Sequence, residues 1–204
     1  MRGSGTRALR AGFPLVATLV FFLEGECARA QAPLVPEAPP GPCWHLILTY
    51  GQASAPRSQG FAETATLSVS RDVPLGSGFA WGLELTPLAL VNLTRVDLPD
   101  HPRESRALVA GAPFLAFEAF PRSAVGLRLE AGVGILWAFA PVPAEGSRFN
   151  FFEFAGARVR IRLSRRAALA LGARRTHISN FAVVGPDNPG LSFYAGALAL
   201  DFAR

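Results

Sequence analysis

From residue 43 onward, apolar and polar residues alternate along eight segments, and clusters of turn-forming residues separate one segment from the next. Such alternation is typical of β-strands with two different faces, and segments of this length suit strands that cross a membrane as a barrel. No long helical stretch interrupts the pattern. The predicted strands are residues 43–52, 61–71, 77–92, 106–119, 124–139, 149–163, 167–180 and 191–202.

The connectors between these segments alternate in length. Those at 72–76, 120–123 and 164–166 are short, whereas those at 53–60, 93–105, 140–148 and 181–190 are longer and more polar. With the N-terminus in the periplasm, the short connectors fall on the periplasmic side and the long ones on the outer side. Short inner turns, long outer loops and an even strand number are typical of outer-membrane barrels.

The faces of the predicted strands differ in polarity. In the segment 149–163, Arg158, Arg160 and Arg162 alternate with apolar residues, and in the last segment small residues and Asp201 alternate with Leu198. Polar or small residues inside and apolar residues outside are what a narrow lumen and surrounding lipid require. The sequence therefore predicts an all-β fold, an eight-stranded antiparallel transmembrane β-barrel of the bacterial outer membrane.

A soluble β-sandwich or lipocalin-like barrel is the competing interpretation, and it would turn the apolar faces inward. Half of the residues are hydrophobic and only 17% are charged, which favours the membrane barrel. The uneven connectors favour it too. The formal net charge of +5 comes entirely from arginine. Because the arginines alternate with apolar residues or lie in turns, we expect no nucleic-acid partner.

The region before the barrel is predicted to contain a signal peptide and a linker. Residues 1–30 combine early arginines, an apolar stretch over 11–23 and small residues before a cleavage site after Ala30, which predicts a signal peptide. Residues 31–42 are proline-rich and predict an extended linker. The barrel domain then spans 43–204. Cleavage would leave Cys43 as the only cysteine, so no intramolecular disulfide is expected.

One pair of polar residues stands out near the end of the seventh segment. His177 and Ser179 are two positions apart, so on a strand they face the same way, together with Leu169 and Leu171. If those leucines contact lipid, the pair lies on the lipid side near the headgroups. A histidine can accept the proton of a serine and activate its oxygen for attack on an ester carbonyl.

The motifs around this pair resemble a known family. "HISN" at 177–180, followed by "NPG" at 188–190, and "FNF" at 149–151, followed by "AGA" at 155–157, are similar to the outer-membrane lipid A 3-O-deacylase (PagL-like) family, also called acyloxyacyl hydrolases. The resemblance implies an esterase acting on lipid A, the membrane anchor of lipopolysaccharide, among outer-membrane lipids. It implies Ser179 as nucleophile, His177 as base and Asn180 as an aid to the oxyanion, with no metal or organic cofactor.

The chain departs from the family at the third catalytic position. Family members carry a glutamate shortly after the glycine that begins the last strand, and here Ser192 occupies that place. Three interpretations follow. A His/Ser dyad could act alone, Ser192 or a water could hold the imidazole, or another carboxylate could replace the glutamate.

Strand register points to Glu153 as that carboxylate. A three-residue turn at 164–166 would pair residues whose numbers sum to 330, which puts Glu153 opposite His177. We therefore predict that Glu153 orients His177; the alternative is an interfacial carboxylate that reaches for headgroup water. Arg175, on the same face, is expected either to contact lipid A phosphates or to extend to the interface.

Two other functions stay open. A non-catalytic barrel, structural or lipid-binding, could have kept the deacylase scaffold. A soluble secreted barrel that binds an apolar ligand is a third possibility.

Overall fold

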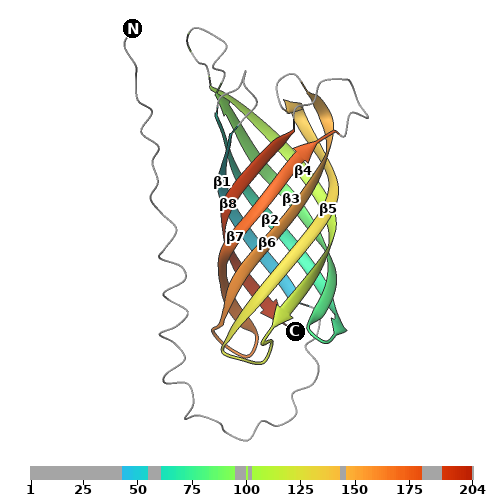
Figure 1. Ribbon diagram of the computed structural model, residues 1–204, viewed down its shortest axis with the longest axis vertical. Coiled ribbons are helices and arrows are strands. Elements are labelled where there is room, and N and C mark those ends of the chain that lie inside the picture. The colour runs from blue at the N-terminus through green and yellow to red at the C-terminus, as the bar shows by residue number, and fades with distance from the viewer. Residues whose placement is uncertain are drawn as a thin grey trace, which may run out of the picture. The chain divides into compact units, whose positions relative to one another are not determined.

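The chain forms eight long β-strands (Figure 1). A computed structural model describes residues 43–54, 61–94, 100, 103–142, 146–180 and 190–203. The predicted signal peptide and most of the outer connectors lie outside these residues. The strands are β1 (Cys43–Ser54), β2 (Phe61–Gly76), β3 (Phe79–Thr94), β4 (Arg103–Ala119), β5 (Val125–Val142), β6 (Ser147–Arg162), β7 (Ala167–Ser179) and β8 (Leu191–Ala203).

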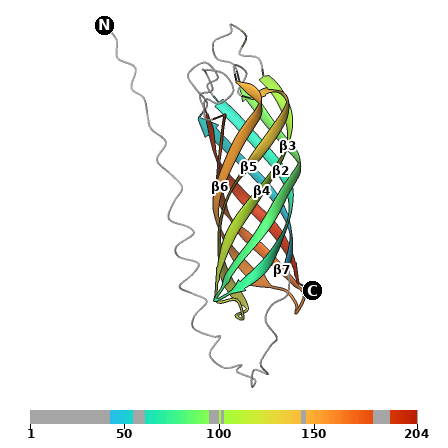
Figure 2. The same cartoon turned by 90° about the vertical axis from the view of Figure 1, so that its right-hand side faces the viewer.

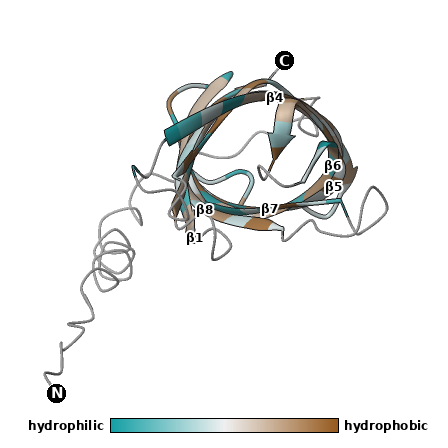
Figure 3. Cartoon of the chain, turned by 90° about the horizontal axis from the view of Figure 1, so that it is seen from above, coloured by the Kyte–Doolittle hydropathy of each residue, from teal (hydrophilic) through white to brown (hydrophobic). Residues whose placement is uncertain are grey.

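Each strand pairs antiparallel with the next, and β1 pairs with β8 to close the barrel (Figures 1 and 2). Figure 3 looks down the barrel and shows this ring of strands. The lower end, at the bottom of Figure 1, is where β1 begins and β8 ends, since Cys43 pairs with Ala203. The upper end is where β7 ends at Ser179 and β8 begins at Leu191. The predicted fold class is confirmed.

The largest error in the predicted boundaries lies at 72–76, which was expected to be a turn. β2 instead continues to Gly76, and the turn consists of Ser77 and Gly78. Pro74 suggested a turn because proline cannot donate a backbone hydrogen bond, but it is tolerated at a strand irregularity. The register does shift between Pro74 and Gly76. The positive φ angles of Gly76, Ser77 and Gly78 then reverse the chain.

The two surfaces of the barrel have opposite character, as the alternation predicted. The wall exposes large apolar side chains, which suits contact with lipid. These include Leu46, Leu48, Leu83, Leu85, Leu129, Ile135, Val159, Leu171, Leu198 and Leu200. An eight-stranded barrel is narrow enough for its inward side chains to fill it. No helix long and apolar enough to cross a bilayer occurs in the part of the chain that the structure describes.

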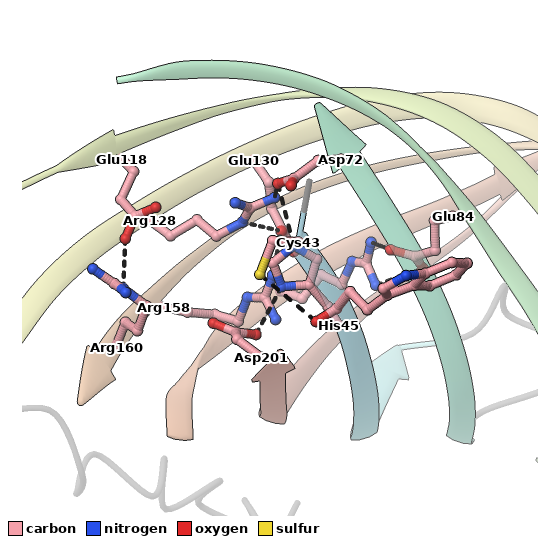
Figure 4. Close-up of polar contacts among 12 residues, drawn as sticks. Cys43, His45, Asp72, Glu84, Glu118, Arg128, Glu130, Arg158, Arg160 and Asp201 are labelled. Atoms are coloured by element: carbon pink, nitrogen blue, oxygen red, sulfur yellow. Dashed lines mark hydrogen bonds and ion pairs between the residues drawn. The ribbon is translucent and has the colours of Figure 1, made fainter. Parts of the chain in front are cut away.

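The lower part of the interior holds a buried polar network (Figure 4). His45 lies between two carboxylates, with Nδ1 2.7 Å from Asp201 and Nε2 3.2 Å from Asp72. Arg128 contacts the same oxygen of Asp72 at 2.7 Å. Because Asp72 is on β2 and Asp201 on β8, the imidazole of His45 on β1 links three strands across the closure of the barrel.

Two further ion pairs lie in the lumen: Arg158–Glu130 joins the neighbouring strands β6 and β5, whereas Arg174–Glu84 crosses the barrel from β7 to β3. Arg158 donates to Glu130 at 2.6 Å, and Arg174 donates through both terminal nitrogens to Glu84 at 2.9 and 2.7 Å. Neither of these hydrogen-bonded pairs includes Asp201. Asp201 instead bonds to His45, since their positions are paired on β1 and β8. Buried charges need such partners, and Arg158 is only 1% exposed.

The upper part of the interior is mostly apolar, although Asn150 and Asn180 are also buried there. Alternate residues from the upper halves of all eight strands pack together in the lumen, among them Leu93, Leu136, Phe152, Ile178 and Phe193. Three of these residues, Phe152, Ile178 and Phe193, belong to β6, β7 and β8. The inner side of these three strands therefore packs against this core, which helps to hold their outer faces in position.

Candidate active site on the outer wall

His177 and Ser179 lie at the upper end of β7 and face outward, as predicted. Both side chains are partly exposed, while Ile178 between them is buried in the apolar core. Leu171 and Arg175, at the same parity, are exposed on the wall. The pair therefore lies on the lipid-facing surface near its upper edge.

Two strands flank His177, one on each side. Glu153 on β6 is its register partner on one side, and Ser192 on β8 is its partner on the other. The predicted register is thus confirmed, including the pairing of Phe151 with Ser179. The role of Glu153 in orienting the imidazole stays a prediction, because register alone brings both neighbours equally close.

The hydrogen bonds distinguish the two neighbours. Nδ1 of His177 lies 2.8 Å from Oγ of Ser192. The Glu153 carboxylate is instead 3.6 Å from Nη1 of Arg175, whose Nη2 donates to Ser192 at 3.4 Å. Glu153, Arg175, Ser192 and His177 therefore form a continuous chain of polar contacts across β6, β7 and β8. Glu153 and Arg175 are nearly half exposed, so their pairing contributes little to stability.

The imidazole also lies against Gly190, the residue just before β8. A Cβ atom at this position would be 2.6 Å from Cε1 and 3.0 Å from Nε2 of His177. Ordinary carbon contacts need more than 3.4 Å, so any side chain at 190 would displace the ring. The imidazole therefore needs a glycine beside its Nε2 edge, and its Nδ1 is hydrogen-bonded to Ser192.

This arrangement suits a base that acts through Nε2. When the imidazole carries its proton on Nδ1, that nitrogen donates to Ser192 and Nε2 keeps a lone pair. Asn180, which follows Ser179, has the opposite parity and is 1% exposed. Its side chain therefore lies on the inner side of the wall, and its assignment to the oxyanion stays a prediction.

A groove of about 610 Å³ begins beside these residues. Its lining includes Glu153 and Arg175, then Ala155, Ala131, Leu115 and Trp81. The last four are linked by strand pairing from β6 to β3, since Ala155 pairs with Ala131, Ala131 with Leu115, and Leu115 with Trp81. Trp81 is near the lower end of β3, so this mostly apolar groove descends along the wall from the polar residues.

No group of three or more histidine, cysteine or acidic side chains within the described ranges is arranged to hold a metal ion. The upper edge of the outer wall carries two hydroxyl groups, an imidazole, a carboxylate and a guanidinium group.

The closed barrel with apolar outer wall defines the class of the protein, an integral β-barrel of the bacterial outer membrane. The profile of the lipid A 3-O-deacylase (PagL) family matches residues 63–201, which include β3 to β7 and most of β2 and β8. The chain belongs to this family. No relative was found among curated protein sequences.

Solved structures of outer-membrane barrels share the fold. The outer membrane enzyme PagL is 17% identical with a TM-score of 0.55, covering 76% of this chain and 97% of that structure. Neisserial surface protein A is 12% identical with a TM-score of 0.55, covering 80% and 97%. OprG from Pseudomonas aeruginosa is 9% identical with a TM-score of 0.54, covering 81% and 96%.

Sequence reasoning missed two features of the site. The contact between Gly190 and His177 gives no signal in the sequence beyond the "NPG" motif, because it depends on how the chain enters β8. The contact between Arg175 and Ser192 was also missed. Arg175 has the parity of His177, and Ser192 has that of Leu198, so a shared outward face on adjacent strands could have suggested it.

Proposed function

We propose that this chain is an esterase that hydrolyses the 3-O-acyl ester of lipid A in the outer leaflet by a Ser/His mechanism. The observation that carries the proposal is the position of His177 and Ser179. Both face the lipid side at one edge of the wall, and a mostly apolar groove begins at Glu153, the register partner of His177. A lipid ester at the headgroup level would meet such a pair without leaving the membrane.

In the proposed reaction, Oγ of Ser179 attacks the ester carbonyl carbon while Nε2 of His177 takes the hydroxyl proton. The backbone of Asn180 aids the oxyanion that forms, because the side chain of this residue lies on the inner side of the wall. Collapse of the tetrahedral intermediate breaks the bond to the sugar oxygen, which receives the proton from His177. Water, deprotonated by His177, then attacks the acyl–Ser179 ester and releases the fatty acid and the free serine.

In this proposal, Ser192 orients the imidazole of His177 in place of the family's glutamate. Its Oγ lies 2.8 Å from Nδ1 of His177, and when it accepts a hydrogen bond from the Nδ1–H group, Nε2 is left as the basic nitrogen. A neutral hydroxyl stabilises the imidazolium less than a carboxylate would, so we expect slower turnover than with a complete triad. Glu153 offsets the charge of Arg175 beside the imidazole, which is an indirect role.

The substrate would be held at two places. The groove takes the acyl chain, since its lining from Ala155 to Trp81 is apolar. Arg175, nearly half exposed at the head of the groove, contacts a lipid A phosphate. Holding the chain and the headgroup together would place the ester next to Ser179.

The mass of lipid A in outer membranes tests the proposal. Membranes that contain the wild-type chain are compared with membranes that contain Ser179→Ala at the same level. Loss of one hydroxyacyl chain with the wild type only is the expected result. Unchanged lipid A in both samples favours the second candidate, a non-catalytic lipid-binding barrel. The serine in place of the family's glutamate is the observation that favours that candidate.

A further inference from the structure

Two neighbouring turns at the lower end of the barrel carry three exposed arginines. Arg122 lies in the turn between β4 and β5, and Arg165 and Arg166 lie in the turn between β6 and β7. Among the residues that the structure describes, no acidic side chain pairs with any of these three guanidinium groups. An unneutralised cluster of this kind favours an anionic ligand.

The two turns are fixed to each other and internally. Arg162 donates its backbone N–H to the carbonyl of Ala124 at 2.8 Å, and its guanidinium donates to the carbonyl of Pro121 at 2.9 Å. Within the second turn, Oγ of Ser164 accepts the backbone N–H of Arg166 at 3.2 Å. The backbones that carry the arginines are thereby held in place before any ligand binds, which lowers the entropy cost of binding.

Each turn also exposes a large apolar residue just before its arginine. Phe120 is 69% exposed and Leu163 is 61% exposed. Arginine at a membrane edge extends its guanidinium to the headgroups, while neighbouring apolar side chains stay among the acyl chains. The cations and the apolar residues together match the two parts of a phospholipid, a charged phosphate and its chains.

We propose that these turns bind an anionic phospholipid of the leaflet at the lower end of the barrel. Arg122, Arg165 and Arg166 contact the headgroup phosphate, to which guanidinium groups can donate two parallel hydrogen bonds. Phe120 and Leu163 pack against the acyl chains. The site is at the opposite end from His177, and it does not depend on the proposed esterase activity.

Native mass spectrometry of the folded chain in detergent tests this site with phosphatidylglycerol and phosphatidylcholine of the same acyl chains. The wild-type chain is expected to retain phosphatidylglycerol preferentially. The variant R122Q/R165Q should bind it about thirtyfold more weakly, because each arginine near an anionic surface strengthens binding about fivefold. The charge-keeping variant R122K/R165K should retain most of the binding.

The matched control is R103Q/R148Q, which removes two exposed arginines from the upper end. It should bind phosphatidylglycerol like the wild type. Equal retention of the two lipids by the wild-type chain would overturn the proposal. So would equal losses in the two glutamine variants, since these would indicate general charge attraction. Heat-dependent gel mobility confirms that each variant is folded before it is compared.

Discussion

At the residue scale, two serines share the outward face of the wall with one histidine. Ser179 is two positions along the same strand from His177, whereas Ser192 on β8 makes the hydrogen bond to Nδ1. A histidine can use one nitrogen for a nucleophile and the other for an orienting group. The different positions of the two serines therefore suggest different roles.

Single alanine substitutions separate these roles. Ser179→Ala should lower kcat by more than about a thousandfold, because the nucleophile is lost. Ser192→Ala should lower kcat only about fivefold to tenfold, since it removes one neutral hydrogen bond. Release of fatty acid from lipid A by purified variants measures both. The reverse order of effects would show that Ser192 is the nucleophile.

Restoring a carboxylate at position 192 should have the opposite effect. In Ser192→Glu, a charged acceptor would face Nδ1 of His177 and stabilise the imidazolium formed during attack. We expect kcat to rise severalfold, as measured by the same release of fatty acid. An equal or lower kcat in a folded Ser192→Glu variant would argue that the neutral hydroxyl is required.

The contact between Gly190 and His177 gives a further residue-scale prediction. Gly190→Ala places a Cβ atom 2.6 Å from Cε1 of the imidazole, so the ring must shift by most of an ångström. Displacements of about 1 Å in a catalytic group cost up to a hundredfold in rate, so kcat should fall roughly tenfold to a hundredfold. Gly196→Ala in the same strand is the control, because its Cβ would meet nothing within 4 Å. Equal activities of the two variants would contradict the expected displacement.

At the scale of the elements, the closure between β1 and β8 depends on a buried charge cluster. His45 on β1 bonds to Asp201 on β8 and to Asp72 on β2, and all three side chains are buried. Removing one member of a buried charged group leaves its partners uncompensated. The cluster should thus contribute more to closing the barrel than a neutral hydrogen bond in the same strand.

Unfolding in detergent measures that difference. His45→Ala should lower the free energy of unfolding by about 3 kcal/mol, because two carboxylates lose their partner. Thr49→Ala, which removes a neutral hydrogen bond to Thr66 from the same face of β1, should cost about 1 kcal/mol. Urea-dependent loss of the heat-modifiable gel band reports both. Similar losses in the two variants would show that the charges add nothing to closure.

Strand pairing and face assignment could be predicted from the sequence because they follow a period of two. The three-residue turn at 164–166 fixed the register of β6 and β7, and with it the position of Glu153 opposite His177. The side-chain partners could not be predicted in the same way. Glu153 had both His177 and Arg175 within reach, and which contact forms depends on side-chain geometry.

The side-chain partners in the polar network could not be predicted either, because they are far apart in the sequence. Alternation places His45 in the lumen, but its partners Asp72 and Asp201 are 27 and 156 residues away in the chain. Only closure of the barrel brings these positions together. The predicted turn at 72–76 was wrong for a local reason, because a strand irregularity accommodates Pro74, a residue type that ordinarily marks a turn.

At the scale of the whole molecule, polar and apolar residues are distributed differently in the interior and on the surface of the barrel. The interior is polar below and apolar above, so the strands carrying His177, Glu153 and Ser192 are backed by a packed core. The surface has polar residues at the upper edge and exposed arginines at the lower edge, separated by an apolar wall. This arrangement suits a protein that spans the outer membrane and works on lipid at its upper edge.

The most direct test of the central claim is hydrolysis of lipid A by the purified, folded chain. The wild-type chain should release one 3-O-linked hydroxy fatty acid per lipid A, detected by mass spectrometry, whereas Ser179→Ala and His177→Ala should release none above background. Absence of release by the wild-type chain, or equal release by Ser179→Ala, would contradict the proposed reaction at Ser179.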